Sequence, residues 1–525
     1  MNSMMSFENE SVQLLMLLAG TIVLDRLVLS LRSISKNTFN VRVRIGLLFL
    51  SILAPAGWLL NDQLTPSIGA RIFAVGMGII WIIGIVPTRR VAPANQSELE
   101  LAATPLTKGI MCILLGFTLL VPATIVPLFV LAHFLIRSWF RYLSNTELLL
   151  PHAISVMLCA YYCVSIFVSI PDQALFLGAI SITGAHYFLS GTKKITIGWC
   201  RANVLANITV GAHTHNNWNM VAKHPKFLQL LYWSGPIAQP LVIMLEVAAI
   251  LSFVNWYMTL VVFLSLIAMH LMIFITTGIL FWKWILTLAT ILIAANTIHL
   301  APLGMSDPLT IILCLTAPFV IFQIPSLAWF DSPVSKNMQF ILCDDDGGAS
   351  INPYDVAPLD SLLSQARHEF YFADGIQALD CLGATYCRDT AIALNRLSLA
   401  QNVSFETMKH EAISILTKLE PTRFNMQSVR HETSLLLNQL LYNLGHPRRF
   451  NIRNNHIWNA KPSGDYRLMS SLLLSPSCRL IVHRDIYFYS RYHNTSLLLE
   501  RRTIEIQVSM CQVTGVLQTE IDTKS

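Results

Sequence analysis

The sequence predicts an all-α polytopic membrane bundle of about ten to eleven transmembrane helices with an appended C-terminal α+β soluble domain. Charged residues make up only 13% of the 525 residues and hydrophobic residues 54%, whereas a soluble protein carries about 25% charged residues. The charges are also unevenly placed, because residues 331–525 hold most of the acids. We therefore expect a transmembrane domain at 1–330 and a soluble domain at 331–525.

The apolar runs of the first domain define its elements. The run Ile110–Ile136 is too long for one upright helix, since about twenty residues cross a bilayer, and Pro122 and Pro127 interrupt it. It is either one tilted, kinked helix or a hairpin of two short helices. The hairpin keeps the basic loops on one side of the membrane, and the positive-inside rule predicts that this side is cytoplasmic. The soluble domain would then also lie in the cytoplasm. The other runs are Val12–Leu31, a second ending at Leu60, Ala70–Val86, Leu149–Ile170, Ala174–Leu189, Leu228–Phe253, Tyr257–Phe281, Trp284–Leu300 and Leu309–Phe330.

The soluble domain shows both kinds of secondary structure. Residues Asp344–Gly348 read as a turn between two short strands. Helical periodicity dominates Asp360–Asn443, and apolar residues alternate with polar ones from Ile504 to Met510, as in a half-buried strand. A mixed α+β domain is expected.

Five ionisable residues inside or beside apolar runs of the first domain need an explanation. Glu246 and His270 each lie in mid-run, where a charged group is costly and is a functional hypothesis by default. A mutual hydrogen bond that holds two helices together explains them equally well. Asp25 next to Arg26 is either a functional pair or an interfacial pair from which the arginine extends to water, and we favour the second. The sequence Trp282-Lys283-Trp284 has the aromatic and cationic signature of a membrane interface.

The most informative stretch, His186–Trp199, closes the run before it with two adjacent lysines, Lys193 and Lys194. A lysine at the edge of a low-dielectric site is destabilised as an ammonium and becomes available as a base. Two lysines after an apolar run also serve as an ordinary cytoplasmic anchor.

The block Tyr187-Phe188, Gly191, Lys193-Lys194 and Trp199 resembles the YFxxGxKKxxxxW pattern of vitamin K-dependent γ-carboxylases, in the membrane domain of the wider HTTM superfamily. Glu246 and His270 also fall where that superfamily carries an acid and a histidine. The resemblance covers about a quarter of the chain and, in character, is nearest to bacterial HTTM proteins.

The resemblance implies a lysine-containing intramembrane site for a quinone or other lipid, with a reduced quinone as the cofactor. It implies that Lys194 is the base beside Lys193, while Glu246 and His270 orient the ligand or set the charge. The other lipid- or quinone-binding residues that it implies are Tyr187, Gly191, Trp199 and His152. The resemblance therefore implies a membrane enzyme that uses a quinone or another isoprenoid. It would lie in a bacterial inner membrane, with membrane lipids as its partners.

Two departures from the γ-carboxylases keep a second hypothesis open. Only Ile170–Gln173 separates the lysine run from the one before it, where the carboxylases have a long polar loop, and their large propeptide-binding region has no counterpart. The alternative is a non-enzymatic membrane scaffold or transporter-like subunit, in which the lysines only anchor. We expect no metal site, because no carboxylate or thiol of obvious spacing completes the histidines His213, His215 and His224. The sequence has no basic run interleaved with aromatic residues, so it does not predict nucleic-acid binding.

Overall fold

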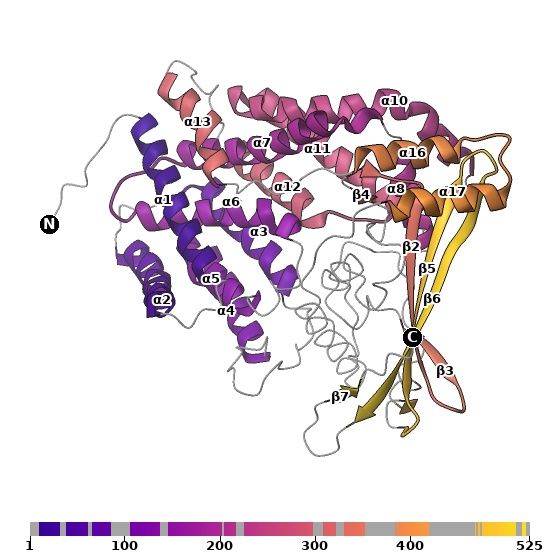
Figure 1. The fold of residues 1–525 in the computed structure, drawn as a ribbon. Helices are drawn as coiled ribbons and strands as arrows, with labels where there is room; N and C mark the ends of the chain where they lie inside the picture. The colour runs from indigo at the N-terminus through magenta and orange to yellow at the C-terminus, as the bar shows by residue number, and fades with distance from the viewer. Residues whose placement is uncertain are drawn as a thin grey trace.

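The computed structural model describes residues 10–31, 38–60, 66–85, 105–136, 145–201, 204–216, 225–297, 308–321, 330–351, 384–385, 387–418, 468, 471–472, 475–510 and 517–520. Within these ranges the protein is mostly helical, with a small antiparallel sheet in the C-terminal region (Figure 1).

Most apolar runs of the sequence fold as helices whose ends lie near those expected. The last run, Leu309–Phe330, differs: its helix ends at Ile321 in the described part of the chain, and Phe330 lies in a short β-strand. Ile110–Ile136 is broken at Val121, where a short 3₁₀ turn, Pro122–Thr124, separates two helices that contact each other. The two-helix alternative is therefore the one that the structure adopts. The helices are α1 Glu10–Leu31, α2 Thr38–Leu60, α3 Ile68–Ile85, α4 Pro105–Leu120, α5 Ile125–Ile136, α6 Asn145–Val164, α7 Asp172–Ile197, α8 Val204–Asn216, α10 Pro225–Ala248 (continued by a 3₁₀ turn, η3, to Val254), α11 Trp256–Thr277, α12 Trp282–Thr297 and α13 Pro308–Ile321.

Helix α7 lies at the centre of the helical part. It contacts α1, α6, α10, α12 and α13, and 83% of its most apolar segment is buried, against 28% for α10 and for α11. It ends at Gly198, whose φ of 74° places it in the left-handed region that glycine adopts without strain. The side chains of α7 therefore face protein on nearly all sides, and its polar residues need partners on neighbouring helices.

By length and composition, four of the described helical segments are able to cross a membrane: Ser11–Val28, Asp172–Ile197, Lys226–Val254 and Trp256–Thr277. The helices α10 and α11 also carry stripes of exposed large apolar side chains at three- and four-residue spacing. These are Leu230, Trp233, Ile237, Leu241 and Met244 on α10, and Tyr257, Val261, Leu264, Leu271 and Ile275 on α11.

The sheet has the strand order β3-β2-β5-β6-β7, and every neighbouring pair is antiparallel. Its strands are β2 Val334–Cys343, β3 Gly348–Ile351, β5 Arg479–Ser490, β6 Thr495–Met510 and β7 Leu517–Glu520. The expected turn after Cys343 is present, since Asp344 Oδ1 accepts from the backbone N–H groups of Asp346 and Gly347 at 3.0 Å. A separate two-residue pair joins β1, Phe330–Asp331, to β4, Ala384–Thr385.

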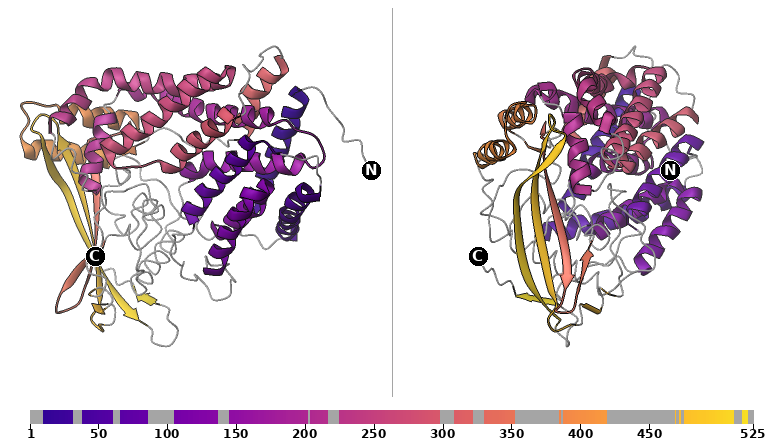
Figure 2. Two further views of the ribbon diagram at one scale, coloured as in Figure 1. Left: turned by 180° about the vertical axis from the view of Figure 1, so that it is seen from behind. Right: turned by 90° about the vertical axis from the view of Figure 1, so that its right-hand side faces the viewer.

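Two helices cover one face of the sheet, α16 Arg388–Ser398 and α17 Phe405–Thr417 (Figure 2). Leu394, Leu397 and Met408 from these helices pack with Ile486 and Phe488 of β5 in one buried cluster. The expected helical periodicity is thus confirmed for these two segments, while residues 360–383 and 419–443 lie outside the described ranges.

The sheet region packs directly against the helical part. Ala391 of α16 shares an apolar cluster with Trp199, Val204 and Ile243, which follow or belong to α7, α8 and α10. A second cluster joins Tyr489 of β5 to α8 and α10. The C-terminal region is therefore seated on the end of the helical part that carries the two lysines.

Candidate functional site

One face of α7 carries the predicted lysine site. Tyr187, Gly191 and Lys194 are spaced four and three residues apart, so they follow one another along the same side of the helix. This side faces α10, which supplies Glu246, and α11, which supplies His270. The structure therefore brings five of the predicted site residues onto one seam between three helices.

Lys194 and Glu246 form an ion pair. Lys194 Nζ lies 2.5 Å from Glu246 Oε1, and the two side chains are 14% and 4% exposed. The lysine is therefore one half of an ion pair rather than an isolated base. The second carboxylate oxygen, Oε2, is buried and has no hydrogen-bond partner in the described part of the chain.

Lys193 lies apart from this pair. Neighbouring residues in an α-helix point about 100° away from each other, and Lys193 is exposed while Lys194 is largely covered. Only one of the two lysines therefore reaches the seam.

Tyr187 and His270 form the second contact of the seam, deeper along α7. The hydroxyl of Tyr187 and Nε2 of His270 are 2.7 Å apart, and both residues are buried. The His270 ring lies against Phe281 and Trp284, with centroids 5.3 and 5.2 Å away. The polar pair is thus enclosed by flat aromatic surfaces.

Trp199 links the ion pair to the C-terminal region. Lys194 Nζ lies 5.1 Å from the centroid of the Trp199 ring, a cation–π distance. The same tryptophan is buried against Phe330 and Ala391. The predicted residue is therefore in the site, and through it the charge of Lys194 lies next to α16.

Gly191 lets α7 and α10 approach closely. A Cβ atom at this position would lie 2.9 Å from Val247 Cγ2 and 3.0 Å from Glu246 Cβ, both closer than a normal contact. A glycine at this position brings the two backbones near enough for Lys194 to reach Glu246.

His152 belongs to a different cluster. Its Nε2 lies 2.8 Å from Asp25 Oδ1 and its Nδ1 lies 3.0 Å from His133 Nε2. His133 Nδ1 in turn lies 3.0 Å from the carbonyl oxygen of Phe129. The three side chains form a buried line across α1, α6 and α5. These contacts place His152 in this line and not beside Lys194.

The adjacent residues Asp25 and Arg26 do not pair with each other. Asp25 is buried and bonds His152, while Arg26 Nη2 donates to the carbonyl oxygen of Val320 at 3.3 Å. Lys283 is only 7% exposed, and its Nζ lies 5.6 Å from the Trp282 ring centroid. The interfacial interpretation of Trp282-Lys283-Trp284 stays a prediction.

Sequence reasoning missed Trp284 and His133 as parts of these clusters, and it did not single out His186, whose ring lies 5.1 Å from that of Trp284. The available signal was the same one that identified His270, a histidine within an apolar run. Among the described residues, no group of three or more His, Cys, Asp and Glu side chains has the geometry to hold a metal ion. The side chains of His213 and His215, and all of His224, lie outside the described part.

Comparison with known proteins gives no relative. No protein-family model, no curated protein and no solved structure matches the chain.

Proposed function

We propose that this protein is a multi-pass integral membrane protein that binds the hydroxylated head of a lipidic molecule, such as a reduced quinone, in the seam between α7, α10 and α11. The observation that carries the proposal is Glu246 Oε2, a buried carboxylate oxygen without a hydrogen-bond partner among the described residues. Leaving such a group unsatisfied costs about 1–3 kcal/mol or more. A ligand hydroxyl that donates to Oε2 removes this penalty.

The residues around His270, on the same seam as Glu246, suit a ring-shaped headgroup. Phe281 and Trp284 lie in a stacked arrangement, with centroids 5.2 Å apart, and aromatic faces favour contact with a flat ring. Tyr187 and His270 add hydrogen-bonding atoms on the same seam. The resemblance of the Tyr187–Trp199 block to quinone-using HTTM proteins points to the same class of ligand.

The membrane location is supported by the surface of α10 and α11. Monomeric soluble proteins seldom expose large contiguous apolar patches, and such patches indicate a membrane or a protein partner. The stripes on these two helices coincide with two segments that are long and apolar enough to cross a bilayer. We place the protein in a bacterial plasma membrane, on the resemblance, with its C-terminal domain in the cytoplasm.

A scaffold function is the second candidate, and the close packing at Gly191 favours it. In that function the ion pair only fixes α7 against α10 and no ligand is bound. Both candidates predict a stabilising Lys194–Glu246 pair, so stability alone does not separate them.

Mass spectrometry of the lipid that co-purifies with the full-length protein separates the two functions. We expect a hydroxylated isoprenoid or quinol in extracts of the wild type, much reduced for Glu246→Ala. Lys193→Gln is the matched control, because it removes a neighbouring charge that faces away from the seam, and it should retain the lipid. Equal lipid content in the wild type and Glu246→Ala would refute the binding site and leave the scaffold.

A further inference from the structure

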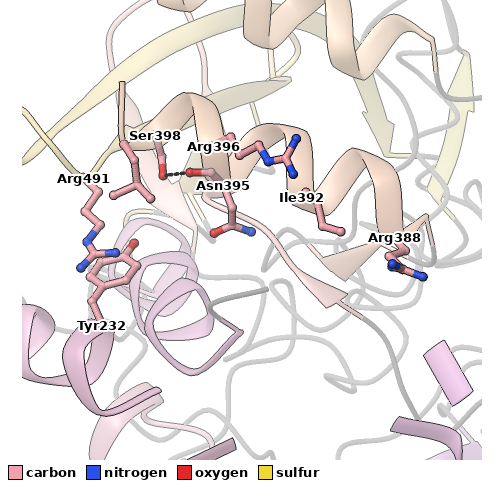
Figure 3. A pocket seen from close by; sticks show the side chains of 8 residues that line it. Tyr232, Arg388, Ile392, Asn395, Arg396, Ser398 and Arg491 are labelled. Carbon is pink, nitrogen blue, oxygen red and sulfur yellow. Dashed lines mark hydrogen bonds between the residues drawn. The ribbon is translucent and has the colours of Figure 1, made fainter. Parts of the chain in front are cut away.

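A pocket of about 390 Å³ lies where the C-terminal region meets α10, and arginines dominate its polar lining. Figure 3 shows Arg388 and Arg396 along α16, and Arg491, from the turn between β5 and β6, against Tyr232 of α10. Arg491 Cζ lies 3.9 Å from the centroid of the Tyr232 ring, which fixes the orientation of this guanidinium. The pocket therefore presents three positive charges from two separate segments.

These charges are not neutralised within the described residues. Arg388, Arg396 and Arg491 take part in none of the ion pairs there, and no acidic residue lines the pocket. Three like charges around one cavity repel one another, and an anion bound between them would relieve this. Guanidinium groups donate in a planar fork that matches the oxygens of a phosphate.

We propose that this pocket binds the phosphate group of an anionic lipid. The inference that the phosphate belongs to a lipid rests on the proposed membrane location. Tyr232 lies near the start of the segment Lys226–Val254, which is long enough to span a membrane. The end of a spanning helix lies at the level of the lipid phosphates. Ile392 and Leu399 give the pocket apolar surface beside its charges, which suits the glycerol and acyl ends of such a molecule.

The test uses the full-length protein in nanodiscs of phosphatidylcholine, with or without phosphatidylglycerol, and measures Tm. Ligand that binds only the folded state raises Tm. We expect phosphatidylglycerol to raise the Tm of the wild type and not that of the double variant Arg388→Gln/Arg396→Gln. Both arginines are exposed, so the variant should fold. Lys418→Gln, an exposed cation at the end of α17, is the control and should respond as the wild type does.

Two outcomes would overturn the proposal. An equal response of the wild type and the double variant would show that the pocket is not the site. A rise with inorganic phosphate in pure phosphatidylcholine discs, and none from phosphatidylglycerol, would replace the lipid with a soluble phosphate compound. The arginine changes should leave the lipid that co-purifies through Glu246 unaffected, so failure here is distinguishable from failure of the proposed function.

A second inference comes from counting protons along the line Asp25, His152 and His133. The Phe129 carbonyl oxygen accepts, so His133 Nδ1 carries a hydrogen. If both imidazoles are neutral, His133 Nε2 must then accept from His152 Nδ1, and His152 Nε2 is left without a hydrogen. That nitrogen lies 2.8 Å from Asp25 Oδ1, and a carboxylate also only accepts.

We infer that this line binds one additional proton, which resides on Asp25, His152 or His133 and makes the cluster neutral as a whole. Each placement satisfies the three hydrogen bonds between Asp25 and the Phe129 carbonyl. Trp81 of α3, which lies beside the His133 ring, and Ser155 of α6, which accepts from Trp81 Nε1 at 2.8 Å, are both neutral. The adjacent cation, Arg26, donates to Val320 instead. The bundle therefore contains a buried proton-binding site.

The variant Asp25→Asn tests the count, because its amide donates to His152 Nε2 and no extra proton is needed. For the wild type we expect the folding equilibrium to weaken about tenfold per pH unit above about pH 6.5, where free histidine is neutral. Asp25→Asn should keep a Tm close to that of the wild type at neutral pH and lose this dependence. Asp25→Ala should lower Tm at every pH, since it removes the carboxyl group that bonds His152 Nε2. If Asp25→Asn retains the pH dependence, or is as unstable as Asp25→Ala, the proton count is wrong.

Discussion

Lys194 Nζ lies 2.5 Å from Glu246 Oε1, 52 positions later in the chain, and Gly191 one turn before the lysine brings their two helices together. The pair is largely removed from water, with side chains 14% and 4% exposed. In such a setting an unpaired charge is far more costly than the pair is stabilising.

The first prediction concerns this pair. Lys194→Met should lower the free energy of unfolding by about 3 kcal/mol, because it leaves the Glu246 carboxylate buried without a cation. The double variant Lys194→Met/Glu246→Leu should recover most of that loss, since no charge remains. Equilibrium unfolding of the purified protein in a fixed lipid mixture measures the free energy of unfolding of the wild type, the single variant and the double variant. Additive losses in the double variant would show that the two residues do not interact energetically.

The second prediction concerns the approach of α7 to α10. Gly191→Ala should destabilise the protein by about 1–3 kcal/mol, because the added methyl group meets Val247 and the backbone of α10. Gly116→Ala in α4 is the matched control. Its Cβ would meet nothing within 4 Å, and alanine is favoured over glycine in a helix by about 0.5–1 kcal/mol. Tm should thus fall for the first variant and rise slightly for the second, and a rise for both would contradict the close packing.

The helices themselves could be predicted from the sequence, since runs of apolar residues mark where most of them lie. The contacts between side chains of different helices could not be predicted. Nothing in one sequence determines which side of one helix faces which side of another. Asp25 and Arg26 were interpreted together because they are adjacent, yet neighbours on a helix point about 100° apart, and Asp25 bonds His152 instead. The same rotation separates Lys193 from Lys194.

The lysine seam could be predicted from the sequence, for a different reason. The block Tyr187, Gly191 and Lys194 has helical spacing, so its members had to share a face wherever the helix was placed. Glu246 and His270 stood out because each is ionisable within an apolar run. The family resemblance implies that His152 belongs to the same site, but its contacts are with Asp25 and His133. The arginine pocket had no sequence signal, because Arg388 and Arg491 are brought together only by the packing of the sheet region.

The third prediction concerns the pH dependence of the sheet. Burial tends to raise the pKa of Asp485, but hydrogen bonds from Arg501 and Tyr487 and the charge of Arg501 outweigh it, so the pKa is lower than usual. A lowered carboxyl pKa stabilises the folded state above the unfolded value, about 3.9, and this contribution is lost as pH falls through the folded value. Hydrogen exchange in peptides of β5 and β6 should therefore show protection that is constant above about pH 5 and declines below about pH 4.

Asp485→Asn should remove this acid dependence and lower protection at neutral pH, because the two 2.7 Å contacts from Arg501 lose their charged acceptor. Glu505→Gln is the control on the same sheet. Its contact with Arg479 is exposed, and such surface pairs contribute little. An acid-induced decline of the same size in Asp485→Asn would assign the effect to another group.

The last prediction tests the membrane location with the protein's own cysteines. Cys112 in α4 and Cys387 just before α16 are both exposed in the structure. In water both thiols would react with a maleimide. If α4 lies in a bilayer, its surroundings are hydrocarbon, which excludes a charged reagent and disfavours the reactive thiolate. In sealed inside-out vesicles, a membrane-impermeant maleimide should therefore modify Cys387 and leave Cys112 unmodified, as read by peptide mass spectrometry, while denaturation in detergent exposes both. Rapid modification of Cys112 in intact vesicles would mean that the apolar surface of this helix faces water or a protein partner, and the bilayer assignment would fail.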